Sequence, residues 1–266
     1  MDFSSFLDCF SEDVVSIDDY LDRVQNIERF IQRKRKCKKW NIFYRGDRYF
    51  TPVQSNLFRR NQLADEADNF QKWQLSCKDS KSGSFECLAK MQHHINGTRL
   101  LDFTEDPLVA LRFACGEEGD NCPKKITVYC TDFVEMDTTE WENIKKAFMK
   151  LVTANETLSN VCFDKKEKEL LCRDYFVRAI PAFERIKRQK GLFLLMGNQK
   201  FSNNKREIKF CETHKIKHEL SPTAGRGKFE PGFVGVLKIN PLNIEKIRND
   251  LESSCHYRMK YLMNEE

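Results

Sequence analysis

The 266-residue sequence has no long run of apolar residues. Its best run, residues 192–196, falls far short of the ~18–20 residues that a membrane-spanning helix needs. The first residues are followed by acidic ones instead of the basic and apolar regions of a secretory signal. No internal repeat and no low-complexity segment is visible. These absences argue against a membrane protein, a collagen, a coiled-coil array and a secreted mini-protein, and predict a cytoplasmic protein with no membrane partner.

Charged residues make up 32% of the chain and hydrophobic residues 40%, a balance typical of globular proteins. The length corresponds to one large domain or two small ones, enough to bury a core without staples. The net charge of +5 is too mild to indicate nucleic-acid binding by itself. One basic run, residues 33–39, is either a solvated helix end or a surface that faces phosphate.

The eleven cysteines include no pair with the C-x-x-C spacing. Without a signal sequence, this pattern favours a reduced cytosol over a disulfide framework. Cys211, His214 and His218 form a C-x2-H-x3-H cluster that Cys255 or His256 would complete as a tetrahedral zinc site. The cluster lies in a short lysine-rich segment with no second knuckle. We therefore expect no metal site, and keep a zinc-dependent hydrolase as a third alternative.

Helices and strands alternate along the chain without the regular spacing of βαβ units, which predicts an α+β fold. Capping boxes at Ser16–Asp19 and Thr139–Glu142 mark two helix starts, and Asp106-Pro107 marks a third. Helices are expected over residues 17–31, 64–75, 85–95, 106–115, 139–151 and from 240 onwards. Strands are expected over residues 40–44, 98–103, 126–130, 191–196 and 233–239, the first ending at Arg45-Gly46. Residues 153–172 are ambiguous.

Two segments carry more polar chemistry than packing requires. Arg45 comes at the end of a buried strand, where it needs an anion or a buried partner such as Asp102, and its fork suits phosphate. The glycine that follows it lets the backbone approach closely. Residues 92–114 then place polar groups between two apolar helices, where they must satisfy each other or a ligand. These groups are Gln92, His93, Thr98, Arg99, Asp102 and Thr104.

These segments resemble the FRG domain family, named for its Phe/Tyr-Arg-Gly motif. The matching residues are Tyr44-Arg45-Gly46-Asp47, residues 55–59, the block 92–114, the start at residues 16–21, and Arg185, Gln189, Gly191 and Phe193 of the pattern R-x-x-x-Q-x-G-x-F. The sequence departs from the family at Ile95, where a glycine is usual, at Phe103, where a tryptophan is usual, and by one extra residue before Pro107. The resemblance implies a helical lead-in at 1–39, an FRG domain at 40–256 with an insertion at 198–230, and a tail at 257–266.

The family in turn resembles ADP-ribosyltransferases, which implies a split mixed or antiparallel sheet with flanking helices and a cleft that holds NAD as substrate. It also implies a bacterial or phage-related toxin or defence effector that modifies a protein or nucleic-acid acceptor. Under this resemblance the expected catalytic residues are Arg45, Asp102, Glu184 and Gln189. The expected NAD-binding residues are Tyr44, Arg45, Gly46, His93, Thr98, Arg99 and Thr104.

The sequence lacks the E-x-E or Q-x-E pattern that such enzymes carry on a late strand. Gln189-Lys190-Gly191 stands there instead. Gln189 either binds a ribose hydroxyl or pairs the backbone at a strand start, and Glu184, Glu207 and Glu230 are the candidate carboxylates. The missing motif leaves a rival hypothesis: a non-catalytic module that binds a nucleotide or nucleic acid in the same cleft through Arg45, Arg99 and the basic run.

Overall fold

The fold is described from a computed structural model of the protein. The structure describes residues 3–34, 41–48, 53–60, 65–76, 84–95, 97–119, 122–131, 134–135, 137–153, 162–178, 184–197 and 232–263. The zinc cluster considered above, the insertion at 198–230, Glu207 and Glu230 therefore lie outside the described residues, as does most of the basic run. No helix in the described part of the chain is long and apolar enough to cross a membrane.

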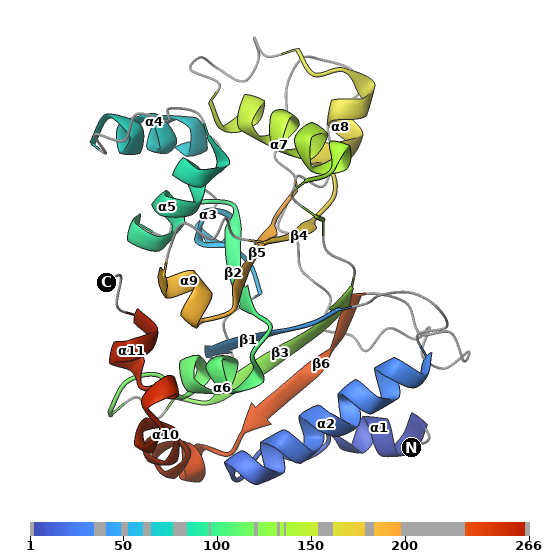
Figure 1. The fold of residues 1–266 in the computed structure, drawn as a ribbon, viewed down its shortest axis with the longest axis vertical. Coiled ribbons are helices and arrows are strands. Elements are labelled where there is room, and N and C mark those ends of the chain that lie inside the picture. The colour runs from blue at the N-terminus through green and yellow to red at the C-terminus, as the bar shows by residue number, and fades with distance from the viewer. Residues whose placement is uncertain are drawn as a thin grey trace.

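A six-stranded sheet, with the spatial order β4-β5-β2-β1-β3-β6, forms the centre of the molecule (Figure 1). Its strands are β1 (Asn41–Arg48), β2 (Leu100–Thr104), β3 (Lys124–Thr131), β4 (Tyr175–Arg178), β5 (Gly191–Leu195) and β6 (Gly232–Ile239). Every neighbouring pair is antiparallel, so the predicted α+β class is confirmed and its strand arrangement is antiparallel, not mixed.

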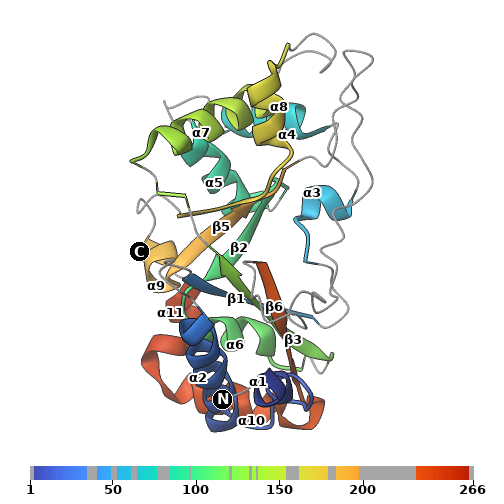
Figure 2. The same ribbon diagram turned by 90° about the vertical axis from the view of Figure 1, so that its right-hand side faces the viewer.

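The sheet is divided at its middle. β1 pairs with β3 along all of Asn41–Arg48, and β2 pairs with β5 along all of Leu100–Thr104. Between β1 and β2, however, one pair alone is in register, Tyr44 with Thr104. The result is two three-stranded halves, β1-β3-β6 and β2-β5-β4, which meet at one point and diverge from it (Figures 1 and 2).

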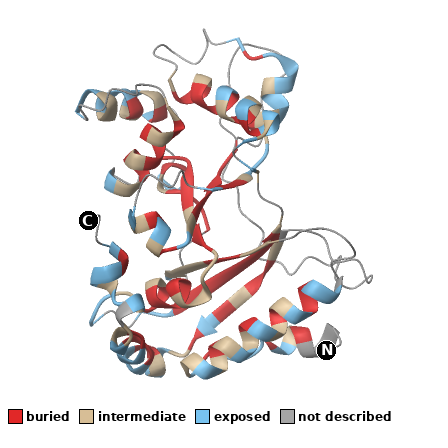
Figure 3. Ribbon diagram, in the orientation of Figure 1, coloured by how far each residue is buried: buried red, intermediate tan, exposed pale blue. Residues whose placement is uncertain are grey.

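Each half has its own helical cover (Figures 1 and 3). The helices α1 (Phe3–Asp8), α2 (Ile17–Lys34), α6 (Pro107–Cys115) and α10 (Ile244–Ser253) share a core with β1, β3 and β6. The helices α4 (Glu66–Ser76), α5 (Phe85–Ile95), α7 (Thr139–Val152), α8 (Lys165–Leu171) and α9 (Glu184–Arg188) share another with β2, β4 and β5. A third cluster, to which α3 (Asn56–Arg59) contributes, packs residues of both halves together. Apolar burial of this kind is the main favourable term in folding.

Local sequence signals place most helix starts correctly. The amide of Asp19 donates to Ser16 Oγ, and the Asp19 carboxylate accepts from the amide of Val15, so the first predicted cap is confirmed. Asp106 accepts from the amides of Leu108 and Val109 at the start of α6, as predicted. The prediction for α7 was wrong by one residue: the N-cap is Thr138, because its hydroxyl accepts from the amide of Trp141.

The first strand is longer than the sequence indicated. β1 continues through Arg45 and Gly46 to Arg48, because β3 supplies backbone partners along its whole length. Arg45 therefore lies within a strand, not at its end. The ambiguous segment 153–172 contains α8, which begins with a capping box between Asp164 and Glu167. β4, α9 and α11 (Met259–Met263) had no clear signal, since each is five residues or shorter.

Gly46 marks a close approach between β1 and α6. A Cβ atom at this position would lie 2.0 Å from the carbonyl oxygen of Ala110 and 2.5 Å from the amide nitrogen of Ala114. Both atoms belong to the helix backbone, which a side-chain rotation does not move. The glycine of the Tyr-Arg-Gly motif is thus required by helix packing.

We expect Gly46→Ala to lower the free energy of unfolding by about 3 kcal/mol, the cost of overpacking against backbone. Urea denaturation measures this loss, with Gly119→Ala as the control variant. Gly119 has open space around it and a φ of 81°, so its substitution costs only the ~1–2 kcal/mol of a left-handed conformation. An equal or smaller loss at Gly46 would contradict the packing argument.

Candidate functional site

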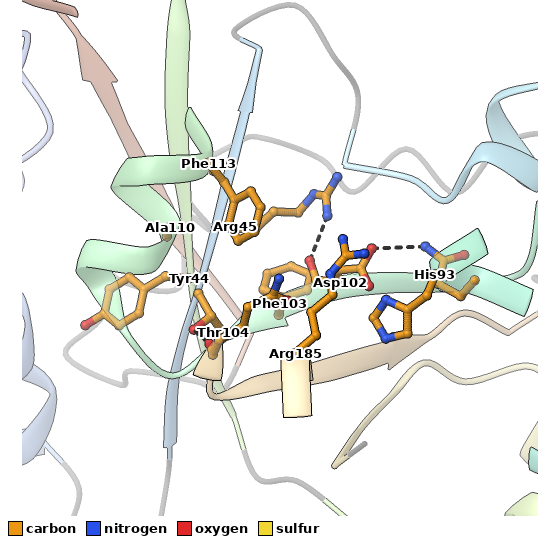
Figure 4. A pocket seen from close by; sticks show the side chains of 12 residues that line it. Tyr44, Arg45, His93, Asp102, Phe103, Thr104, Ala110, Phe113 and Arg185 are labelled. Carbon is orange, nitrogen blue, oxygen red and sulfur yellow. Dashed lines mark hydrogen bonds between the residues drawn. The ribbon is translucent and has the colours of Figure 1, made fainter. Parts of the chain in front are cut away.

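A cavity of about 250 Å³ lies where the two half-sheets diverge (Figure 4). β1, β2, α5, α6 and α9 all contribute to its wall. The lining residues are Tyr44, Arg45, Gly46, Gln92, His93, Asp102, Phe103, Thr104, Ala110, Phe113, Arg185 and Gln189. The wall therefore combines aromatic rings with two arginines and one carboxylate. A concave, partly apolar site with a few polar groups that point inward is typical of small-molecule binding.

Arg45 crosses from one half-sheet to the other. Its Nε donates to Asp47 Oδ2 at 2.8 Å on its own strand, and its Nη1 donates to the carbonyl oxygen of Asp102 at 2.7 Å on β2. The side chain is 14% exposed. A charge-assisted hydrogen bond thus links β1 to β2 beyond the one backbone pair that they share. The sequence left two roles open for Arg45, a buried partner or a bound anion. In the structure Arg45 has the buried partner and also lines the cavity.

Asp102 belongs to a chain of hydrogen bonds behind the cavity. Gln92 Nε2 donates to Asp102 Oδ2 at 3.0 Å, while Gln92 Oε1 accepts from Thr98 Oγ1 at 2.6 Å. Thr98 in turn accepts from the amide of Leu100 at 3.0 Å. Each side chain orients the next one, so the Asp102 carboxylate is held in place and accepts its hydrogen bond from the Gln92 amide.

A cluster of cations extends from Arg45 over the same face of the sheet. Lys125, only 3% exposed, stands opposite Asp47 in the register of β1 and β3. Burial lowers the pKa of Lys125; Asp47 opposes this shift, and Arg45 and Arg59 add to it. Burial also lowers the pKa of Arg59, with Arg45 and Arg60 among the repelling charges. The lowered pKa values mean that the charged forms of Lys125 and Arg59 are disfavoured in the protein. A bound anion would stabilise these charges.

α9 is fastened to its surroundings through Gln189. Its Nε2 donates to the carbonyl oxygen of Leu262 in α11 at 2.9 Å, and its own carbonyl accepts from Thr104 Oγ1 at 2.5 Å. Glu184, at the other end of α9, is 51% exposed and pairs with Lys187. The structure thus places Gln189 beside the cavity in a linking position, and Glu184 on the outer surface.

Arg99 lies in the core behind the cavity. It forms a fully buried ion pair with Glu66 of α4, with Nε donating to Oε1 at 2.8 Å. Its Nη1 donates to the carbonyl oxygen of Met196 at 3.0 Å. These partners give the buried charge a complete structural role.

Of the predicted site residues, the structure brings Tyr44, Arg45, Gly46, His93, Asp102, Thr104 and Gln189 to the cavity wall. It places Thr98, Arg99 and Glu184 elsewhere. The hydroxyl of Tyr44 points away and donates to Glu28 Oε1 at 2.9 Å, and burial raises its pKa far above the usual range. Five lining residues were missing from the predicted set: Gln92, Phe103, Ala110, Phe113 and Arg185. Gln92 and Arg185 had a signal, since both stand in the motifs quoted above.

A second cavity, of about 600 Å³, adjoins the first and shares Gly46 and Phe113 with it. It extends along the end of β1 towards Lys124 and the turn after α6. Among the described residues, no group of three histidine, cysteine or acidic side chains is placed to hold a metal ion.

Comparison with known families identifies part of the chain. Residues 40–122 match the family model of the FRG domain. The chain contains an FRG domain. No curated protein and no solved structure matches the chain. The matched segment of the FRG domain runs from β1 to the turn before β3, and so includes Arg45, Gln92 and Asp102. Arg185 and Gln189 lie beyond it.

We expect Arg99→Met to lower the free energy of unfolding by about 3–5 kcal/mol, because it leaves Glu66 buried without its counter-charge. The double variant Arg99→Met/Glu66→Leu should recover much of this loss, and urea denaturation measures both. A stable Arg99→Met protein that had lost only ligand affinity would contradict the structural role and restore the predicted binding role.

Proposed function

We propose that the cavity binds NAD and that the protein transfers ADP-ribose from it to a macromolecular acceptor. One observation carries this proposal. Among the described residues that line the cavity, Asp102 is the one carboxylate, and arginines approach it from β1 and from α9 (Figure 4). The reaction needs both kinds of group, because the phosphates of NAD are anionic and the reacting ribose becomes positive.

Asp102 supplies the charge that the reaction requires. The bond between ribose C1′ and the nicotinamide nitrogen breaks, and nicotinamide leaves as a neutral molecule with the bonding electrons. Positive charge develops on the ribose, and a fixed carboxylate stabilises it in the transition state. An acceptor nucleophile then bonds to C1′ and loses its proton. Gln92 and Arg45 hold Asp102 through its carboxylate and its carbonyl, so little reorganisation is needed.

The size of the site supports a ligand in two parts. The first cavity is smaller than the ~300–1,000 Å³ of typical ligand pockets, so it suits the nicotinamide-ribose end of NAD. The adjoining cavity offers room for the remainder. The proposal includes the ADP-ribosyltransferase-like fold, which the divided sheet supports, and an FRG unit that extends to residue 256. It also includes a toxin or defence role, which rests on the resemblance alone, and a cytoplasmic location, which rests on the sequence composition.

We expect Asp102→Asn to slow nicotinamide release from labelled NAD by about 10²–10³-fold, the usual cost of removing one charge-stabilising group. The change is nearly isosteric and keeps an acceptor for Gln92, so the melting temperature should stay close to that of the wild type. Purified protein is incubated with a cell lysate, and label on protein and on nucleic acid is counted separately.

Glu184→Gln serves as the matched control, since Glu184 is the other described carboxylate proposed from the sequence. It should leave turnover unchanged because it lies on the outer surface. Loss of turnover in Glu184→Gln with normal turnover in Asp102→Asn would overturn the assignment. Absence of nicotinamide release from the folded wild type would overturn the transferase itself.

A second candidate is a non-catalytic module that binds a nucleotide or a nucleic acid. The cation cluster of Arg45, Arg59 and Lys125 favours it, because neighbouring cations match a row of phosphates.

Salt dependence separates the two candidates. We expect ADP-ribose affinity to change little between 50 and 200 mM salt, whereas a nucleic acid that neutralises several cations loses affinity steeply. Calorimetry with ADP-ribose and with a single-stranded oligonucleotide makes the comparison. Tight, steeply salt-dependent oligonucleotide binding that Lys125→Gln weakens would favour the second candidate.

A further inference from the structure

Arg185 lines the cavity, and its side chain forms no hydrogen bond or ion pair with any residue that the structure describes. Its Nε is shielded from solvent and has no partner in the part of the chain that the structure describes. Buried donors almost always find an acceptor, so an unsatisfied one needs an explanation. The other arginine of the wall differs in this respect, because Arg45 is engaged by Asp47 and Asp102.

The nearby carboxylate does not satisfy Arg185. The side chain extends from α9 towards Asp102 (Figure 4), yet the two form no ion pair. Asp102 instead accepts from Gln92, which holds it in the hydrogen-bond chain of β2 and α5. The protein thus keeps an arginine fork beside a carboxylate and leaves the fork open towards the cavity.

The position of Arg185 is fixed although no described residue pairs with its guanidinium. Gln189, the residue after α9 and four residues beyond Arg185, bonds to Leu262 of α11 and to Thr104 of β2. Arg188 adds a contact in which its guanidinium lies 5.0 Å from the centre of the Tyr261 ring. A helix fastened at this end directs Arg185 into the cavity, which explains why the R-x-x-x-Q spacing spans one helical turn. Pre-organised donors of this kind are typical of ligand sites.

We propose that Arg185 binds the anionic group of the ligand, a phosphate, and that Gln189 and α11 act as positioning elements for it. The guanidinium fork donates hydrogen bonds to two phosphate oxygens at once. The ligand then presents phosphate to α9 and its flat nicotinamide ring to the aromatic wall at Phe113. This inference deepens the proposed function and rests on it for the nucleotide nature of the ligand, but its phosphate-binding part is separately testable.

The test measures binding of three probes, NAD, ADP-ribose and inorganic pyrophosphate, by calorimetry. The proteins are wild type, Arg185→Gln, Arg185→Lys and the control Lys187→Gln. Lys187 is on the same helix, is 50% exposed and pairs with Glu184, so its variant removes one positive charge outside the cavity. Without ligand, Arg185→Gln should melt at the wild-type temperature or slightly above it, because no protein partner is lost.

We expect Arg185→Gln to weaken all three probes by tenfold or more, Arg185→Lys to weaken them less, and Lys187→Gln to leave them unchanged. Equal binding by wild type and Arg185→Gln, or equal losses in Arg185→Gln and Lys187→Gln, would overturn the inference. So would a wild type that binds none of the probes, or an Arg185→Gln protein that fails to fold, since that would reveal a structural partner.

The two proposals fail separately. If the wild type binds pyrophosphate through Arg185 and releases no nicotinamide from NAD, this inference stands and the transferase falls. If Arg185→Gln binds and turns over NAD as the wild type does, the transferase stands and this inference falls.

Discussion

The hydrogen bond from Arg45 to the carbonyl of Asp102 joins two half-sheets that share a single backbone pair. Because β1 and β2 diverge, their backbones form no further pair on either side of Tyr44 and Thr104. The side chain of Arg45 links the two strands there instead. The cavity exists for the same reason, since it occupies the angle that the unpaired strands leave. The contact that stabilises the junction and the groups that face a ligand are therefore partly the same atoms.

Much of the polar block at residues 92–114 serves this junction. Thr98 and Gln92 orient Asp102 through hydrogen bonds. Thr104 donates to the backbone carbonyl of Gln189, which follows α9. Asp106 caps α6, and this helix packs against Gly46. Arg99 lies one layer deeper, in its pair with Glu66. The polar groups of this block that line the cavity are Gln92, His93, Asp102 and Thr104, and Arg45 and Arg185 reach it from β1 and α9. Polar residues are frequent in this block because they position the strand β2 on both of its faces and at both of its ends.

The sequence predicted those features that depend on local chemistry. Caps at Ser16 and Asp106 and the helical period of residues 85–95 were legible because each is decided within a few residues. The cavity wall was found in part, since Arg45 and Asp102 stand in recognisable motifs. Arg99 was misplaced because its partner Glu66 is distant in sequence, and nothing local indicates that a helix will deliver a carboxylate to it. Arg185 was not predicted as a site residue for the opposite reason. Its role is inferred from the absence of a described partner for its guanidinium, which a sequence does not reveal.

The path of the chain between the two halves has a consequence for folding. It runs from β1 in one half to β2 in the other, returns for β3, leaves again for β4 and β5, and comes back for β6. Neither half is a continuous piece, and the FRG match at 40–122 holds strands of both halves without the β5 and β6 that complete them. Sequence-distant pairings of this kind close large loops and slow the search for the native topology. The half β2-β5-β4 therefore has all its strands only when residues 191–195 have emerged from the ribosome, and the half β1-β3-β6 only when residues 232–239 have followed, so late assembly is a property built into the strand order.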